Sequence, residues 1–268
     1  MASLALQLCV IENELEKDFR GTLEKVKEMG YEGIEFSGLM GHSPKEIREI
    51  CDEIGLVPIS GMVSYEECVA DLEKVIDDYT TIGCKYIVTI SSATRKFLPY
   101  NERFEEFVET LNRVGKRAKE SGMTLLLHNH CRDFLQVDGK YAIDIFLERV
   151  PTDIFAIEID TLSVTLAKVD APAYMRTQKG RIPIVHIRDF FCDIAAHAPD
   201  LAAPAHPLPH DLEFRPLGYG IEDVPALIEA SRDVGAEWLI FETHGVSMGF
   251  SALEIAKMGI DYLKAHGC

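Results

Sequence analysis

Basic residues are scarce in this sequence. Its 268 residues include 27 Lys and Arg against 44 Asp and Glu, which gives a formal net charge of −17 at pH 7. Nucleic acids and anionic lipid surfaces are both bound through a basic face, so this composition argues against either as a partner. Long apolar runs are missing as well. No stretch of 18 consecutive apolar residues occurs, and we therefore expect no segment that spans a membrane.

Paired cysteine motifs are also absent. The chain has seven Cys, an odd number, and none of them forms a C-x-x-C pair. Their spacing matches neither a disulfide framework nor a zinc finger, so we expect reduced thiols in a cytoplasmic protein. The apolar stretch 2–11 lacks the basic residues of a secretory signal and is interrupted by Gln7, which favours a first β-strand there.

The sequence does contain a repeating local pattern. A helical stretch ends at a glycine, a residue or two follow, and an apolar run rich in strand-forming residues begins. Glycine readily takes the left-handed conformation that ends a helix, so each repeat predicts a helix-to-strand loop. The pattern occurs five times, at Gly30, Gly55, Gly83, Gly122 and Gly235.

Eight strand and helix pairs follow from this pattern and from the apolar spacing between the glycines. The predicted strands lie near 4–10, 33–37, 57–62, 85–91, 124–129, 154–160, 182–188 and 237–242. The predicted helices lie near 16–29, 44–54, 66–82, 102–120, 139–149, 171–179, 223–234 and 251–265. Short strands that are apolar on both faces and alternate with helices are typical of a parallel sheet.

Eight such units favour an α/β fold, a single (β/α)8 TIM barrel that forms one domain over 1–268. A doubly wound open sheet is the alternative. No G-x-G-x-x-G motif follows the first predicted strand and no Walker sequence occurs, which weakens the nucleotide-binding forms of that alternative.

One segment interrupts the repeat, between strand seven and helix seven at about 190–220. It contains five prolines and three histidines. An irregular connection of this length is typically a functional lid or an interface element, so we expect it over the carboxyl-terminal mouth of the barrel; a poorly ordered insertion is the alternative. Two of the prolines keep His206 and His210 from sharing one helical face, which disfavours a metal site made from that pair.

Polar side chains gather at the predicted carboxyl-terminal ends of the strands, where TIM barrels carry their catalytic groups. The first two strands carry Gln7 and Glu35. Each of the last four strands has two polar residues spaced by two, which places each pair on one face. These pairs are His128 and His130, Glu158 and Asp160, His186 and Arg188, and Glu242 and His244.

Any one of these residues could be structural, and Glu158 alone fits a buried ion pair. Together they point to a site. Several carboxylates buried in one place need a proton or a cation to offset their charge. Imidazole and carboxylate groups from successive strands are suitable ligands for a divalent metal ion.

At these residues the chain resembles the sugar phosphate isomerase/epimerase family, the xylose isomerase-like TIM barrels. The resemblance covers nearly the whole chain and rests on six motifs in the expected order. They are Met29-Gly-Tyr-Glu-Gly-Ile-Glu-Phe36, Leu127-His-Asn-His130 followed by Asp133-Phe134, Ile159-Asp160-Thr161, His186-Ile-Arg-Asp189, Leu217-Gly-Tyr-Gly220 and Phe241-Glu242. No single motif is specific; their order indicates the family and leaves the reaction open.

The resemblance implies one divalent metal ion, with Mn²⁺ as the first expectation and Zn²⁺, Mg²⁺ or Co²⁺ as alternatives. The family takes its ligands from strands five to eight in the order Glu, Asp, His, Glu. The matching positions in this chain are His128, Asp160, His186 and Glu242. His128 therefore departs from the pattern, and the two glutamates that transfer protons on opposite faces of the substrate in family epimerases are not both present.

We expect a metal-stabilised enediolate as the reaction intermediate, with Glu242 or His130 as the catalytic base. We expect Glu35, Arg188 and His244 to contact the substrate. An arginine at position 188 would grip a carboxylate or phosphate through two hydrogen bonds and would not act as a base.

Three functions stay open. The first is a metal-dependent isomerase or epimerase of a sugar or sugar derivative. The second is a metal-dependent lyase, a dehydratase of a keto-sugar or cyclic polyol, which shares the early enediolate step. The third is a barrel that has lost catalysis and serves as a binding subunit. The expected partner is a sugar-like small molecule, and association into a homo-oligomer is left open.

Overall fold

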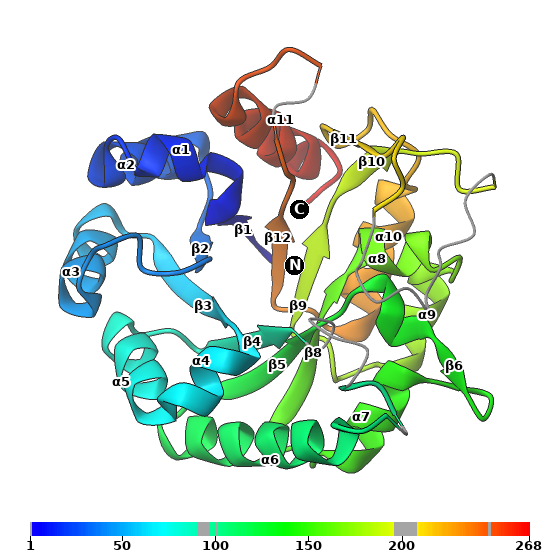
Figure 1. Cartoon of the computed structure of the whole chain (residues 1–268). Coiled ribbons are helices and arrows are strands. Elements are labelled where there is room, and N and C mark those ends of the chain that lie inside the picture. The colour runs from blue at the N-terminus through cyan, green and yellow to red at the C-terminus, as the bar shows by residue number, and fades with distance from the viewer. Residues whose placement is uncertain (1, 91–96, 100, 196–207, 246–247) are drawn as a thin grey trace.

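The structure is a computed structural model of the chain, and it describes residues 2–90, 97–99, 101–195, 208–245 and 248–268. Eight parallel strands close into a barrel in the order β1-β12-β9-β8-β5-β4-β3-β2. Helices surround this barrel (Figure 1), so the predicted (β/α)8 TIM barrel is confirmed. The barrel strands are β1 (Ser3–Gln7), β2 (Gly33–Phe36), β3 (Val57–Val63), β4 (Tyr86–Ile90), β5 (Thr124–His128), β8 (Phe155–Asp160), β9 (Ile184–Ile187) and β12 (Trp238–Phe241).

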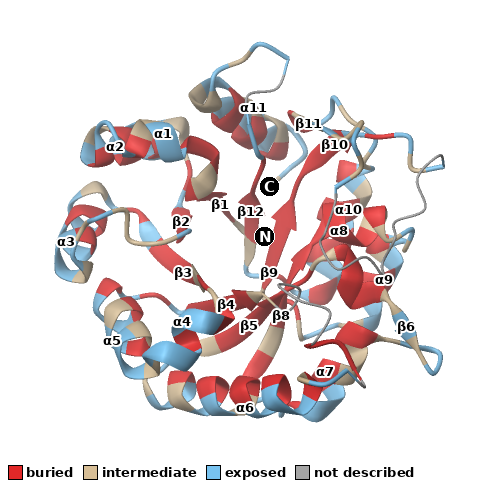
Figure 2. Cartoon of the chain, viewed as in Figure 1, coloured by how far each residue is buried: buried red, intermediate tan, exposed pale blue. Residues whose placement is uncertain are grey.

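The helices that cover the barrel are buried on the side that faces the strands and exposed on the outside (Figure 2). They include α2 (Phe19–Met29), α3 (Pro44–Ile54), α4 (Tyr65–Ala70), α5 (Leu72–Ile82), α6 (Phe104–Glu120), α7 (Ala142–Arg149), α9 (Ala171–Thr177), α10 (Val224–Val234) and α11 (Ala252–Ala265). Gly30 ends α2 with a φ of 99°. Residues with a side chain rarely adopt that φ, so the glycine ends the helix as the repeat predicts.

The first strand is shorter than its prediction near 4–10. It ends at Gln7, and a 3-10 helix, η1 (Leu8–Ile11), and then α1 (Glu12–Leu15) follow. The side-chain oxygen of Gln7 accepts a hydrogen bond from the N–H of Cys9, which caps η1 and turns the chain out of the sheet.

The helix predicted over 66–82 is divided into α4 and α5. Asp71 stands at the division with a non-helical backbone, φ −154° and ψ 77°. Its carboxylate accepts a hydrogen bond from the N–H of Lys74 at 3.1 Å and so caps the second helix. The apolar spacing runs through both helices, which is why the periodicity alone predicts one.

The proline-rich segment at 190–220 contains two strands that the sequence pattern did not predict. β10 (Asp189–Phe191) pairs antiparallel with β11 (Glu213–Arg215). The carboxylate of Asp189 then accepts hydrogen bonds from the N–H groups of Gly218 at 2.8 Å and Gly220 at 2.9 Å, and it ties the return of the chain to the barrel. Residues 196–207, which include His206, lie outside the described residues, so the expected lid or interface role stays a prediction.

Four further short elements lie close to the carboxyl-terminal end of the barrel. They are η3 (Cys131–Phe134), the hairpin of β6 (Gln136–Val137) and β7 (Lys140–Tyr141), and α8 (Thr161–Leu166). α8 begins directly after β8, and Asp160 is its N-terminal cap. In the part of the chain that the structure describes, no helix combines the length and the apolar character needed to cross a membrane.

The inside of the barrel changes from apolar to polar along the strands. A small apolar cluster fills the barrel on the amino-terminal side of the polar residues. It is made of Ala5, Ile59, Tyr86, Val88, Leu126, Ile184 and Ile240. Side chains on one face of a strand recur every second residue. The next inward positions are therefore polar on four of these strands: Gln7 follows Ala5, His128 follows Leu126, His186 follows Ile184 and Glu242 follows Ile240.

Candidate metal centre

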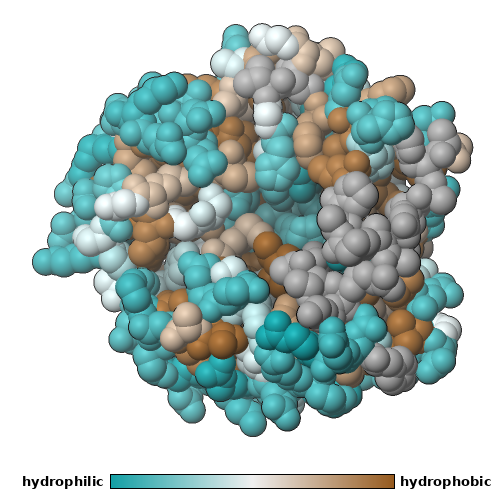
Figure 3. All heavy atoms as spheres, in the orientation of Figure 1, coloured by the Kyte–Doolittle hydropathy of each residue, from teal (hydrophilic) through white to brown (hydrophobic). Residues whose placement is uncertain are grey.

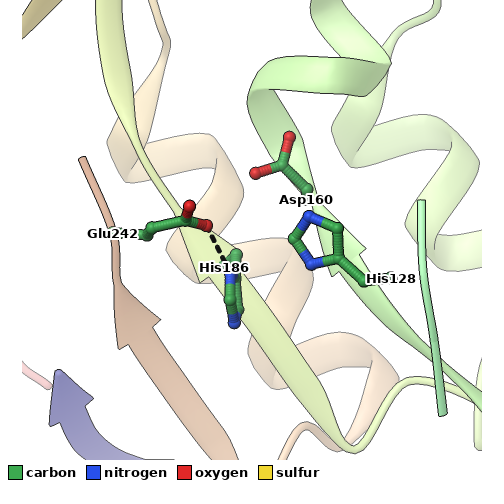
Figure 4. A group of neighbouring side chains, drawn as sticks. All are labelled: His128, Asp160, His186 and Glu242. Atoms are coloured by element: carbon green, nitrogen blue, oxygen red, sulfur yellow. Dashed lines mark hydrogen bonds and ion pairs between the residues drawn. The ribbon is translucent and has the colours of Figure 1, made fainter. Parts of the chain in front are cut away.

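Four buried side chains point toward one another at the carboxyl-terminal end of the barrel (Figure 4). They are His128 at the end of β5, Asp160 at the end of β8, His186 in β9 and Glu242 directly after β12. One potential ligand atom from each lies within 4.8 Å of the others. The structure thus brings together all four residues predicted as metal ligands. In the space-filling view, a hollow with hydrophilic residues opens near the centre of the molecule (Figure 3).

Asp160 is held by hydrogen bonds from two neighbours, Ser163 in α8 and Asn129 directly after β5. Its Oδ1 accepts a hydrogen bond from the N–H of Ser163 at 2.7 Å, as the N-terminal cap of α8. The side chain of Asn129 bonds both backbone groups of Asp160: the N–H donates to Oδ1 of Asn129 at 2.9 Å, and Nδ2 donates to the carbonyl at 3.2 Å. The second carboxylate oxygen, Oδ2, is left facing the cluster.

Both histidines contact carboxylates through their rings. Nδ1 of His186 lies 2.6 Å from Oε2 of Glu242. Nε2 of the same ring lies 2.8 Å from Oε1 of Glu35 and 3.1 Å from Oε1 of Glu158. Nδ1 of His128 lies 2.8 Å from the same Glu158 oxygen. Glu35 and Glu158 are fully buried, so the two imidazoles lie between two layers of carboxylates.

The buried charges shift the pKa values of this cluster. Burial lowers the pKa of His186, but the negative charges of Glu158 and Glu35 outweigh it and hold that pKa well above its usual value. Burial also lowers the pKa of His128, and the hydrogen bond to Glu158 outweighs it, so this pKa is raised as well. Burial and the charge of Glu158 raise the pKa of Glu35 to about 7. A metal ion that bound the imidazoles would have to displace their protons.

Arg188 carries a permanent positive charge at the site. Its Nη1 lies 3.1 Å from Oδ2 of Asp160 and 3.3 Å from Oε1 of Glu242. Burial raises the pKa of Glu242, but the charge of Arg188 outweighs it and the pKa lies well below its usual value. The guanidinium also lies over the ring of Phe214 in β11, 5.0 Å from the ring centre.

Two of the other predicted residues lie near the mouth. His244 is half exposed, and its Nε2 lies 3.2 Å from Oε1 of Glu242. His130 is half-buried, and its ring centre lies 5.2 Å from that of His128. The backbone N–H of His130 donates to Oδ2 of Asp133 at 2.7 Å, which begins η3. Both rings are thus close to the cluster.

Glu35 lies deeper than a residue expected to bind substrate. It is fully buried, and its Oε2 accepts a hydrogen bond from the hydroxyl of Ser60 at 2.6 Å. Its other oxygen contacts His186, as described above. Its contacts with the protein connect it to a predicted metal ligand, while its expected contact with the substrate stays a prediction.

Sequence reasoning did not place Cys9 in this neighbourhood. Sγ of Cys9 lies 4.0 Å from both Oε1 of Glu242 and Nδ1 of His244, and burial raises the pKa of this thiol. Nothing in the cysteine spacing indicates this, because Cys9 is near the cluster only through the turn after β1. Glu158 was predicted among the polar residues at the strand ends, with a buried ion pair as the alternative for this residue alone. Its spacing of two from Asp160 was the available signal.

The four residues fit a divalent transition metal. Two imidazoles and two carboxylates suit Mn²⁺, Fe²⁺, Co²⁺ or Zn²⁺, whereas Mg²⁺ and Ca²⁺ favour oxygen ligands. Opposite ligands of one ion lie roughly 4.2 Å apart, twice a ligand distance of about 2.1 Å. The four ligand atoms lie within 4.8 Å of one another, so only small side-chain movements are needed for all of them to bind one ion. Asp160 and Glu242 are also two buried carboxylates whose charge a cation would offset.

Residues 23–266 match the family model described as a xylose isomerase-like TIM barrel. The chain therefore belongs to the xylose isomerase-like TIM barrel family, as the six motifs indicated. The match covers seven of the eight barrel strands and leaves out β1.

A curated relative carries a more specific name. The chain is 24% identical over 275 aligned residues to a protein of Lacticaseibacillus casei named inosose dehydratase, and the match covers 93% of this chain and 90% of that protein. A protein of Erwinia tasmaniensis with the same name is 21% identical, with 94% of this chain and 91% of that protein covered.

Solved structures with the same fold carry several names. A sugar phosphate isomerase/epimerase from Parabacteroides distasonis superposes with a TM-score of 0.77 at 20% identity, over 98% of this chain and 94% of the other. An L-ribulose 3-epimerase gives 0.73 at 20% identity, over 99% and 94%. The IolI protein, solved with a bound zinc atom, gives 0.76 at 16% identity, over 98% and 97%. These likenesses show the fold.

Proposed function

We propose that this protein is a metal-dependent lyase that removes water from a keto derivative of a cyclic polyol. The observation that carries the proposal is the buried cluster of His128, Asp160, His186 and Glu242, whose ligand atoms lie within 4.8 Å of one another. The curated relatives named inosose dehydratase support the reaction, since they match more than nine-tenths of this chain. The zinc atom bound to the IolI protein supports a divalent metal in this fold.

The chain supplies a base on each side of the cluster. When bound, a divalent ion would supply a Lewis acid that stabilises negative charge on the substrate oxygens. Glu242 or His130 takes the proton from the carbon next to the carbonyl, and the other member of the pair returns a proton. In a lyase that proton goes to the departing hydroxyl, which leaves as water. Arg188, which contacts both Asp160 and Glu242, holds a positive charge close to the developing anion.

The residue at position 128 favours a lyase over an epimerase. Family epimerases use two glutamates on opposite faces of the substrate, and the first of them corresponds to His128. Here Nδ1 of His128 is engaged by Glu158 at 2.8 Å, and the residue is buried. It therefore offers the site a ring nitrogen in place of a carboxylate base.

An isomerase or epimerase is the second candidate function. Glu242 and His130 follow β12 and β5, which are separated in the barrel by β9 and β8. Two proton-transfer groups on different sides of a substrate are what an epimerisation needs. The likeness to an L-ribulose 3-epimerase is compatible with this candidate. The third interpretation, a binding subunit without catalysis, is tested by the same experiment.

The test combines metal analysis with a substrate assay in heavy water. We expect about one divalent ion per chain in the wild type and loss of that ion in Asp160→Ala and His186→Ala. Asp153→Ala is the matched control, because Asp153 is exposed and pairs with Lys119 outside the barrel. A keto-inositol incubated with Mn²⁺-loaded protein should lose the mass of one water. Deuterium exchange into a keto-sugar without loss of water would favour the isomerase or epimerase. No ion and no exchange would leave the binding subunit.

A further inference from the structure

Glu158 contacts both histidines of the candidate metal centre through a single oxygen. Its Oε1 lies 2.8 Å from Nδ1 of His128 and 3.1 Å from Nε2 of His186. The side chain is fully buried, so no water competes for these contacts from the surface. In the strand register, His128 of β5 is the direct partner of Glu158 in β8. The pairing of the two strands thus places this carboxylate beneath the histidine.

Glu35 makes a second contact with His186 from the opposite wall of the barrel. Its Oε1 lies 2.8 Å from Nε2 of His186, and the hydroxyl of Ser60 fixes its other oxygen at 2.6 Å. Each imidazole therefore has one nitrogen against a buried carboxylate. The second nitrogen of His186 faces Glu242, and that of His128 lies on the side of Asp160 (Figure 4).

We propose that Glu158, assisted by Glu35, is a positioning residue that fixes the tautomer and orientation of both histidine ligands. This inference rests on the proposed metal-dependent function. A neutral imidazole has one N–H and one lone pair. A carboxylate that accepts the N–H of Nδ1 in His128 leaves the lone pair of Nε2 facing Asp160. In His186 the ion-pair contacts of Nε2 with Glu158 and Glu35 favour the proton on that nitrogen, which leaves the lone pair of Nδ1 facing Glu242. Hydrogen bonds of this kind orient metal-bound histidines and make the coordinating nitrogen more basic, which strengthens its bond to the metal.

One shared oxygen makes the two ligands depend on each other. If Glu158 loses its charge, both rings lose the same negative neighbour at once, although Glu35 still contacts His186. We therefore expect Glu158→Gln to weaken metal binding more than Glu35→Gln does. The change keeps the shape of the side chain and one acceptor oxygen, so the effect would come from the lost negative charge.

The experiment is a Co²⁺ titration of the metal-free full-length protein followed by visible absorption, which reports ligand geometry as well as affinity. We expect Glu158→Gln to weaken Co²⁺ binding roughly 10- to 100-fold and to shift the absorption bands. Glu35→Gln should give a smaller loss. Glu237→Gln is the matched control, since Glu237 is part-exposed and pairs with Lys85 and Tyr86 away from the centre. It should bind like the wild type.

Histidine ¹⁵N spectra of the Zn²⁺-loaded wild type and Glu35→Gln extend the test if Glu158→Gln does not fold. In the wild type we expect His128 to be protonated at Nδ1 and His186 at Nε2, and in Glu35→Gln a change confined to His186. The opposite tautomers would overturn the inference, as would a Co²⁺ affinity and spectrum in Glu158→Gln equal to those of the wild type. A second ion per chain that is lost with Glu158 would make Glu158 a ligand and would also overturn it. A wild type that binds no Co²⁺ would overturn the metal centre as a whole, which separates the two failures.

Discussion

Oε2 of Glu242 lies 2.6 Å from Nδ1 of His186, although Glu242 follows β12, His186 lies in β9 and the two residues are 56 positions apart in the chain. β9 and β12 are neighbours in the barrel, and Ile240 is the register partner of His186. Glu242 is two residues beyond that partner and on the same face, one step closer to the mouth. Parallel pairing therefore turns two distant residues into a carboxylate–imidazole contact in the candidate metal centre.

This contact predicts that metal binding depends on pH. Buried carboxylates hold the pKa values of His186 and His128 above their usual value, so both rings carry protons below those raised values. A metal ion needs the neutral rings and must release the protons. We expect Mn²⁺ or Zn²⁺ affinity to fall as the pH is lowered from about 8 to about 6, with up to two protons released per ion. Calorimetric titrations in buffers of different ionisation enthalpy measure the release. An affinity that does not change with pH would contradict the raised pKa values.

Arg188 offers a second prediction, about stability. Its guanidinium is buried between Asp160 and Glu242, at 3.1 and 3.3 Å. Removal of one member of a buried charge network leaves the others uncompensated and costs about 3–5 kcal/mol. We expect Arg188→Ala to lower the thermal midpoint in chelator and to recover much of the loss in Mn²⁺, because the ion replaces the missing positive charge. Thermal unfolding with and without Mn²⁺ measures both effects.

The matched control for this prediction is Arg176→Ala. Arg176 forms an exposed ion pair with Asp233 at 2.8 Å. Such surface pairs contribute about 0–1 kcal/mol, and Mn²⁺ should not change the effect of this variant. If Mn²⁺ stabilised Arg188→Ala no more than the wild type, then Arg188 and the ion would not act on the same carboxylates.

The barrel was predictable because local signals repeat along the chain. Glycine ends α2 and α10, and the apolar runs that follow become β2 and β12. The candidate ligands were predictable for a related reason. The period of two continues from the apolar layer at Leu126, Ile184 and Ile240 into the polar layer above it. A pattern within one strand is enough to place a residue on the inner face.

Contacts between strands were less accessible to sequence reasoning. Glu158 meets His128 because β5 and β8 pair in one particular register, and no pattern inside either strand records that register. The pairing of β10 with β11 joins segments that stand on either side of a long irregular stretch. Asp71 divides a helix whose apolar period is uninterrupted, because its own capping hydrogen bond outweighs the periodicity.

A third prediction concerns the anchor of the proline-rich segment. The carboxylate of Asp189 accepts hydrogen bonds from the backbone N–H groups of Gly218, Gly220, Glu222 and Phe190. Loss of the acceptor leaves these donors unsatisfied, and each buried one costs roughly 1–3 kcal/mol. We expect Asp189→Ala to speed hydrogen exchange at 216–222 and in β10, measured by mass spectrometry. Asp233→Ala, on the outer surface, should leave that region unchanged. Equal protection in Asp189→Ala and the wild type would mean that the barrel holds the segment without this anchor.

Position 128 has a histidine where the family resemblance implies a glutamate, and its contact with Glu158 explains the difference. In this chain the residue lies against Glu158, 2.8 Å from its carboxylate. A glutamate there would place two buried carboxylates together, and such a pair cannot keep both charges. We expect His128→Glu to destabilise the protein in chelator, as measured by urea unfolding.

The effect of Glu158→Gln on the stability of the protein should have opposite signs with histidine and with glutamate at position 128. In the wild type, Glu158→Gln removes the negative charge beside His128 and is expected to destabilise the protein. In the His128→Glu background it removes a like charge, so it should stabilise the protein instead. Side chains in direct contact typically couple by about 0.5–3 kcal/mol, which a double-mutant cycle resolves. Glu237→Gln should have the same effect in both backgrounds. If Glu158→Gln also had one effect in both, the carboxylate would not interact with the side chain at 128, and the departure from the family pattern would need a different cause.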